Sequence, residues 1–238
     1  MTARDTWALT ADMFLSETEV ESIRKSIRGR LAGDAPAAWC STKTDELIFE
    51  VLTLSGIRNS EFCHLRLRDA PPSLKQPILQ VAETPRQDRL VAIPKSLSDL
   101  IGDYVRNVRP QLLDRAISAK DLDQPLALND RGRPFDRTNL YRRVVKILSA
   151  AGFETRASVQ LLRHTYGYLA YKRTAGNLLF VQQQLGHAHP MVTAVYAEFV
   201  KFSPTELANL VGQDHPVQGP VTTPRKSPPQ KKPKGRTS

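Results

Sequence analysis

The 238-residue chain has little cysteine and no long apolar run. Its two cysteines, Cys40 and Cys63, form no CxxC pair and lie in no Cys/His cluster with zinc spacing, so we expect free thiols in a reducing compartment. No segment approaches the roughly 20 apolar residues that span a bilayer. The first twenty residues contain acids and no apolar core of signal-peptide length, which is not typical of an exported protein. These absences predict a cytoplasmic protein with no membrane partner.

Positive charge, in contrast, is abundant and unevenly placed. The formal net charge is +10, and residues 225–238 contain six Lys or Arg and no acid, so only +4 belongs to the rest of the chain. Basic proteins favour polyanions, of which DNA is the commonest in the cytoplasm. The segment from 213 onward is rich in Pro, Lys, Gln and Thr and lacks aromatic residues, so we expect a disordered basic tail over 213–238. Within it, Lys226, Lys231 and Lys232 are predicted DNA contacts.

Periodicity and capping signals predict a mainly α-helical chain with one small antiparallel sheet. Ser16 and Glu19 have the spacing of a capping box, and Gly56 is placed to end a helix. Short β-like runs at 78–83 and 90–93 predict a hairpin. Helices are expected at about 16–30, 44–54, 96–108, 136–151, 158–174, 177–185, 190–200 and 204–212, with a short one capped by Asn59 or Ser60. The expected organisation is an irregular arm at 1–14, one domain at 15–212 and the tail.

Four short motifs carry most of the functional information. They are LSGIRNSEF at 54–62, NDRGRPF at 129–135, LLRHT at 161–165 and LGH at 185–187, the last followed by Thr193 and Tyr196. Together they supply arginines, a histidine and a tyrosine. A cation, a proton donor and a phenol nucleophile are the parts needed to break a DNA phosphodiester without a metal.

In this order and at this spacing, the motifs resemble the catalytic domain of the tyrosine recombinase (phage integrase) family over roughly residues 15–199. The resemblance implies a mostly helical domain with a small antiparallel sheet. It also implies a site-specific DNA recombinase that cleaves and rejoins strands through a 3′-phosphotyrosyl intermediate. Tyr196 would be the nucleophile, and Arg58 and Arg163 would stabilise the phosphate in the transition state. Glu61 would support Arg58, and His187 would donate to the phosphate or move protons.

The resemblance also implies partners. The expected partner is double-stranded DNA with short inverted sites, bound by a homodimer or tetramer at the nucleoid. Arg58, Arg86, Arg163 and His187 are the expected DNA contacts of the domain. Leu207, Leu210 and Val211 would dock on a neighbouring subunit or pack on their own core. No cofactor is expected, because two arginines do the work of a metal, and His189 next to His187 lacks a third ligand.

Three departures from the family pattern are visible. Gln160 stands where the family usually has histidine or lysine, and an amide carries no proton charge. The hairpin turn lacks the usual lysine, and its place falls on Arg86 or Thr84, depending on the residue from which it is counted. Arginine would hold charge there but make a poor acid. Finally, only about fifteen residues precede the catalytic region, whereas most members carry an N-terminal DNA-clamping domain.

Alternatives to the recombinase remain open at this point. A catalytically weakened member that acts as a DNA-binding regulator or accessory subunit is the main one, favoured by Gln160 and the absent lysine. A relaxing activity like that of type IB topoisomerases shares the chemistry, and an unrelated helical module that binds nucleic acid is the last. His164, about 100° around the helix from Arg163, is expected to be a packing or supporting residue. The sequence identifies neither the target site nor the choice among integration, excision, inversion and resolution.

Overall fold

The computed structural model describes residues 9–71, 73–84, 87–113 and 121–212. The chain divides into two units, Met1–Lys201 and Phe202–Ser238. Of the second unit, the described part is Phe202, Ser203 and the helix α10 (Pro204–Gly212), in which the Leu207 side chain is exposed. The side chains of Leu210 and Val211 lie outside the described part. The domain limits expected from the sequence stay a prediction.

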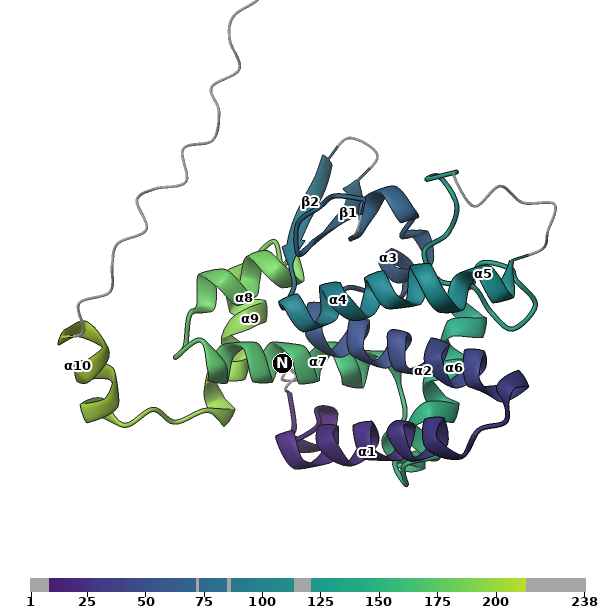
Figure 1. Cartoon of the computed structure of the whole chain (residues 1–238). Helices are drawn as coiled ribbons and strands as arrows, with labels where there is room; N and C mark the ends of the chain where they lie inside the picture. Colours follow the sequence, from purple (N-terminus) through teal and green to yellow (C-terminus); the bar gives the residue numbers. More distant parts are fainter. Residues whose placement is uncertain (1–8, 72, 85–86, 114–120, 213–238) are drawn as a thin grey trace, which may run out of the picture. The chain divides into compact units, whose positions relative to one another are not determined.

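The first unit is helical apart from one hairpin (Figure 1). Its elements are α1 (Glu17–Gly33), α2 (Pro36–Ser55), α3 (Asn59–His64), β1 (Ile78–Thr84), β2 (Gln87–Ala92), α4 (Lys95–Asp103), α5 (Arg109–Leu112), α6 (Arg137–Ser149), α7 (Val159–Arg173), α8 (Leu178–Leu185) and α9 (Pro190–Ala194). A π-helical turn joins α4 to α5, and a 3₁₀ helix, Val195–Phe199, follows α9. The predicted fold class is confirmed. Among the described residues, no helix is long and apolar enough to span a membrane.

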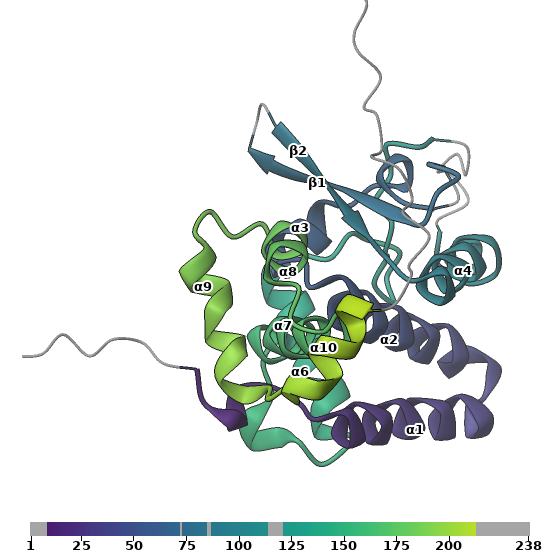
Figure 2. The same cartoon turned by 90° about the vertical axis from the view of Figure 1, so that its left-hand side faces the viewer.

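Helix α2 is the centre of the core. It packs against α1, α4, α6 and α7, and Figure 2 shows it between α1 and α4. Its side chains at 47, 48, 49, 51 and 52 are all fully or almost fully buried. The predicted start at about 44 is wrong, because the helix begins at Pro36. Proline suits the first turn, where its missing N–H has no intrahelical acceptor. The predicted end is confirmed, since Gly56 adopts φ 64 and closes the helix.

Local signals place most other helix starts. The Ser16–Glu19 capping box forms, Asp136 caps α6 by accepting from the Asn139 N–H, and Ser158 caps α7. The short helix α3 differs, because Arg58 and neither Asn59 nor Ser60 occupies its N-cap position. The reason lies in Glu61, whose carboxylate accepts the Arg58 backbone N–H at 2.5 Å. An acid at the third helical position therefore does the capping.

The hairpin β1–β2 is the only sheet found in the described part of the chain, and it is antiparallel as predicted. The register pairs Val81 with Arg89, with an irregularity between Ala82 and Thr84. Leu79, Val81 and Val91 are buried on the core face. Arg86, predicted to stand in for the hairpin lysine, lies outside the described residues.

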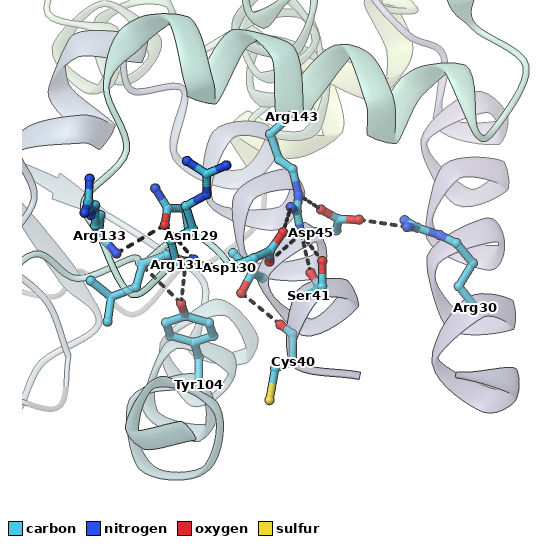
Figure 3. Close-up of polar contacts among 12 residues, drawn as sticks. Arg30, Cys40, Ser41, Asp45, Tyr104, Asn129, Asp130, Arg131, Arg133 and Arg143 are labelled. Carbon is cyan, nitrogen blue, oxygen red and sulfur yellow. Dashed lines mark hydrogen bonds and ion pairs between the residues drawn. The ribbon is translucent and has the colours of Figure 1, made fainter. Parts of the chain in front are cut away.

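A buried ionic network joins α1, α2 and α6 (Figure 3). The Asp45 carboxylate is 2% exposed and accepts hydrogen bonds from Arg30 of α1, at 2.7 Å, and from Nε of Arg143 of α6. Arg143 also donates to Asp130 at 2.7 Å and to the Ser41 carbonyl at 2.8 Å. Burial alone would raise the pKa of Asp130, but the hydrogen bond from Arg143 holds it below its usual value.

This network fixes α6 against α2. The Asn129 turn predicted from the sequence is part of it, because Asn129 Oδ1 accepts the N–H groups of Arg131 and Arg133 at 2.9 and 3.1 Å. The turn thus holds Asp130 in reach of Arg143. The position of α6 matters for function, since its first turns line a groove described below.

Replacing Arg143 by alanine should destabilise the protein, because the change leaves the Asp45 carboxylate buried with one partner fewer. Removing one member of a buried ion pair costs about 3–5 kcal/mol, and we expect a loss near the lower value, as Arg30 stays. Urea unfolding of the full chain measures it. Arg142→Ala, on the exposed face of the same helix, is the control and should stay within about 0.5 kcal/mol of wild type. Equal stability of the two variants would contradict the role of the network.

Candidate active site

Glu61 is the acid that joins two arginines. Its carboxylate accepts from Arg58 Nη1 at 2.7 Å and, in a bidentate pair, from Arg89 Nη1 and Nη2 at 2.6 and 3.0 Å. The Glu61 side chain is 6% exposed. Burial would raise its pKa, but the hydrogen bonds from Arg89 and from the Arg58 backbone keep the pKa lowered. Glu61 is therefore ionised and paired with Arg58, and its supporting role in catalysis stays a prediction.

Arg89 is a site residue that the sequence interpretation missed. It lies on β2 two residues before the buried Val91, so both side chains point to the core face of the strand. Arg89 itself is 9% exposed. Side chains alternate between the two faces of a strand, and a charged residue at an inward-facing position requires a buried partner. For Arg89 that partner is Glu61. This alternation was the signal that could have found it.

The second arginine of the site is Arg163, which is buried on α7. Its Nη1 donates to the Gly56 carbonyl at 2.5 Å and its Nη2 to the Leu185 carbonyl at 2.6 Å. Arg58 Nη2 donates to the next carbonyl, that of Gly186, at 3.0 Å. The two guanidinium groups thus meet at the C-terminal end of α8, where carbonyls attract cations.

The pKa of Arg163 reflects its burial and the positive charge nearby. Burial, and then the nearby charge of Arg58, lower its pKa to about 10, so it stays protonated at neutral pH. Two cations held this close, with one carboxylate between three arginines, leave an unneutralised positive charge. An anion with several oxygens, such as a phosphodiester, is the ligand that relieves it.

His187 lies beside the two arginines. It follows Gly186, which ends α8 with φ 63, and its Nδ1 is 2.9 Å from the Thr193 hydroxyl. Burial, then the charges of Arg163 and Arg58, lower its pKa to about 4. The ring is therefore neutral at pH 7 and carries one N–H that can donate to an anion.

Tyr196 is buried in the second, smaller apolar cluster of the unit. Its side chain is 1% exposed, and Phe14, Val181 and Leu185 belong to the same cluster. The ring lies so close to Gly167 of α7 that a Cβ there would stand 2.2 Å from the ring carbon Cζ. Burial raises the pKa of the Tyr196 phenol to about 12, although the charge of Arg163 acts in the opposite direction. The Arg163 charge is thus close enough to act on the phenol.

The hydroxyl of Tyr196 has a histidine neighbour. His164 Nδ1 is 3.1 Å from Tyr196 Oη, and Gln160 Nε2 is 3.4 Å from His164 Nε2. His164, expected to have a packing or supporting role, therefore contacts the predicted nucleophile. Gln160 is exposed in the first turn of α7, on the same side as the arginines.

A groove of about 370 Å³ opens beside the arginines. Its lining includes Arg58, Gln160 and Arg163 together with Ser158, Arg137 and Tyr141, the last two from α6. The structure thus brings Arg58, Glu61, Arg163, His187, Tyr196 and Gln160 into one region of the first unit. Arg86, Lys226, Lys231 and Lys232 lie outside the described residues, so their predicted roles stay predictions.

Comparison with known proteins gives one consistent family. The model of the phage integrase family matches residues 14–201. Tyrosine recombinase XerC of Halalkalibacterium halodurans is 32% identical over 188 residues, which cover 79% of this chain and 58% of that relative. Tyrosine recombinase XerH of Campylobacter jejuni is 28% identical over 160 residues, covering 67% and 42%. The chain therefore spans about half the length of these relatives.

Solved structures show the same fold. XerA recombinase superposes with a TM-score of 0.59 at 22% identity, covering 89% of this chain and 67% of the other. XerH bound to its palindromic difH substrate gives 0.64 at 20% identity, covering 86% and 54%. Because the family match spans most of the chain and includes the whole arginine–histidine–tyrosine cluster, the chain belongs to the phage integrase family of tyrosine recombinases.

Proposed function

We propose that the protein is a site-specific DNA recombinase that cleaves and rejoins strands through a 3′-phosphotyrosyl intermediate. The observation that carries the proposal is the meeting of Arg58, Arg163 and His187 at the end of α8, with the Tyr196 ring packed against Gly167 on the helix that carries Arg163. A phosphate would find two guanidinium forks and an imidazole N–H at one place. The groove of about 370 Å³ next to them supports entry of a DNA backbone from that side.

In the proposed reaction the Tyr196 oxygen attacks phosphorus. The Oη–P bond forms as the phenol gives up its proton, the bond from phosphorus to the 5′-oxygen breaks, and the 5′-oxygen leaves with the electron pair and takes up a proton. Arg58 and Arg163 stabilise the charge that gathers on the non-bridging oxygens. The phosphodiester energy stays in the phosphotyrosyl bond, so attack by a 5′-hydroxyl restores DNA without ATP.

The other predicted site residues have supporting roles in this proposal. Glu61 keeps Arg58 and Arg89 oriented through its bonds to both. His187, neutral because of its lowered pKa, donates a hydrogen bond to a phosphate oxygen. Gln160, at the mouth of the groove, donates from its amide. Arg86 would contact the leaving strand as a fixed charge rather than as an acid.

The proposed partner is double-stranded DNA with short inverted sites, bound by two or four copies of the chain. Support comes from related structures, since XerH was solved on a palindromic substrate and lambda integrase as a dimer on a core site. Leu207 is exposed on α10, which agrees with a C-terminal segment that docks on a neighbouring subunit. Such a protein would work in the cytoplasm at the nucleoid.

A non-catalytic regulator is the competing function. The burial of Tyr196 and the amide at 160 favour it, whereas the curated relatives, which are named as recombinases, do not. The two functions differ in one product, a covalent protein–DNA adduct. Detection of that adduct therefore distinguishes them.

Wild-type protein should form a covalent adduct with a suicide duplex nicked near the cleavage point, seen on a denaturing gel. Tyr196→Phe should form none, because the phenol oxygen is the nucleophile. Arg163→Lys keeps a charge but loses the planar fork, and its adduct should form about 10²–10³ times more slowly. Melting temperatures of both variants check that they fold. If the wild-type protein forms no adduct on any duplex taken from the genomic DNA that flanks its gene, the result favours a non-catalytic regulator.

Gly167→Ala should displace the Tyr196 ring, because the added carbon would lie 2.2 Å from Cζ. Misplacement of a nucleophile by about 1 Å can cost about 10²-fold in rate, and we expect adduct formation to fall by that order. Gly29→Ala is the matched control. A Cβ at Gly29 of α1 meets nothing within 4 Å, so it should leave the rate unchanged and stabilise by about 0.5–1 kcal/mol. Equal rates for both variants would mean that the ring position does not govern reactivity.

The basic tail should add affinity that depends on salt. Each phosphate that the protein no longer neutralises lowers the slope of log K against log salt by about 0.9. A chain ending at Gly212 should therefore show a shallower slope and weaker binding at low salt. The full-length chain with Lys226, Lys231 and Lys232 changed to glutamine separates charge from length. Fluorescence anisotropy over a range of salt measures both. Unchanged affinity and slope would refute a DNA-binding role for the tail.

A further inference from the structure

His164 joins Gln160 to Tyr196 in a line of polar contacts, and His164 itself has no role in the reaction proposed so far. Gln160 and His164 are four residues apart on α7, so they share one face of the helix. Gln160 Nε2 lies 3.4 Å from His164 Nε2, and His164 Nδ1 lies 3.1 Å from Tyr196 Oη. The two ring nitrogens of His164 thus face the amide on one side and the phenol on the other.

The tyrosine is fixed in this contact by its packing. Gly167, one turn beyond His164, allows the Tyr196 ring to lie against the α7 backbone. The imidazole and phenol rings are 6.2 Å apart at their centroids and tilted by 56°. This is an edge contact through Nδ1 and Oη rather than a stack. A rotation of the phenol away from His164 would have to leave the apolar cluster around Tyr196.

His164 is also in a suitable charge state to accept a proton. Burial and the adjacent Arg163 lower its pKa, so the ring is neutral at pH 7. The charged groups around it are Arg163 on its own helix, and Asp12 and Arg156 across a groove of about 390 Å³ that His164 and Gln160 line. His187, a neutral ring at pH 7, is the other titratable neighbour. A phenol buried beside this ring has little other access to water, since Tyr196 is 1% exposed.

We propose that His164 is the general base for Tyr196, and that Gln160 orients it. The inference rests on the proposed function and deepens it. As Oη bonds to phosphorus, the phenolic proton moves to His164 Nδ1, the 5′-oxygen leaves with the electron pair of its bond, and water protonates it. In the reverse step a 5′-hydroxyl loses its proton to water and attacks phosphorus, the bond from phosphorus to Oη breaks, and the imidazolium returns its proton to Oη.

Gln160 has a defined part in this step. The amide presents either its nitrogen or its oxygen to the ring, depending on a half-turn of its last torsion. When the Gln160 amide oxygen faces His164, the His164 Nε2–H donates to that oxygen. His164 Nδ1 then keeps the lone pair that takes the phenolic proton of Tyr196. The Gln160 amide cannot carry the proton, but the imidazole of His164, one helical turn later on α7, can. The residue that departs from the family pattern therefore acts here as a positioning residue.

The test compares His164→Asn with His164→Ala. The Asn amide can still hydrogen-bond Oη but takes no proton. Single-turnover rates of adduct formation on the nicked duplex are measured from about pH 5.5 to 9. Loss of a general base costs about 10²–10⁴-fold, so both variants should be at least about 10² slower with unchanged DNA affinity. The wild-type rate should rise with pH through one midpoint that both variants lack. His189→Asn, at an exposed histidine, is the matched control and should behave as wild type.

Contrary outcomes are distinct. If His164→Asn forms the adduct at the wild-type rate, the contact between His164 and Tyr196 only positions the phenol ring. If His164→Ala forms the adduct faster than wild type, the contact restrains Tyr196. Either result overturns the base while the recombinase stands. No adduct with wild-type protein would end both proposals. Independently of activity, ¹⁵N NMR of labelled histidines should show a shift of His164 Nδ1 in Tyr196→Phe without DNA, and an unchanged signal would remove the contact itself.

Discussion

The site depends on the close approach of two guanidinium groups that would otherwise repel each other. Arg163 is buried and Arg58 lies next to it, and both donate to consecutive carbonyls at the end of α8. One carboxylate, that of Glu61, is shared by Arg58 and Arg89. Burial, and then the nearby positive charges, lower the pKa values of Arg163 and His187. The fold thus keeps the two guanidinium groups together in the absence of a ligand, and a bound phosphate would neutralise their charge.

The rest of the structure serves to hold that arrangement. Gly56 ends α2 in the left-handed conformation, and its carbonyl accepts from Arg163. A Cβ at Gly56 would stand 2.3 Å from the Tyr166 ring, so this corner tolerates no side chain. The Asp45 network fixes α6, which lines the groove. The Thr165 hydroxyl accepts the Leu15 N–H at 2.9 Å, which ties the segment before α1 to α7.

Much of this could be predicted from the sequence because it depends on local chemistry. Capping residues and Gly56 mark helix ends by backbone hydrogen bonds within one turn, and the motif spacing predicted a site of Arg58, Arg163, His187 and Tyr196, which the fold brings into one region. Contacts between distant segments could not be predicted in that way. Arg89 pairs with Glu61 across 28 residues and His164 meets Tyr196 across 32. The early start of α2 was missed because the apolar stripe of the helix begins only at Leu47, whereas its first turn opens with Pro36, a residue that more often breaks a helix than starts one.

The central claim is that Tyr196 and the two arginines act on one phosphate. A crystal structure of the protein on a nicked duplex with orthovanadate tests it most directly, since vanadate adopts the five-coordinate geometry of the transition state. The account predicts vanadium bonded in line to Tyr196 Oη and the 5′-oxygen, with Arg58 and Arg163 on the equatorial oxygens. Vanadate bound elsewhere, or Tyr196 still packed on Gly167 and out of reach of a phosphate held by the arginines, would contradict it.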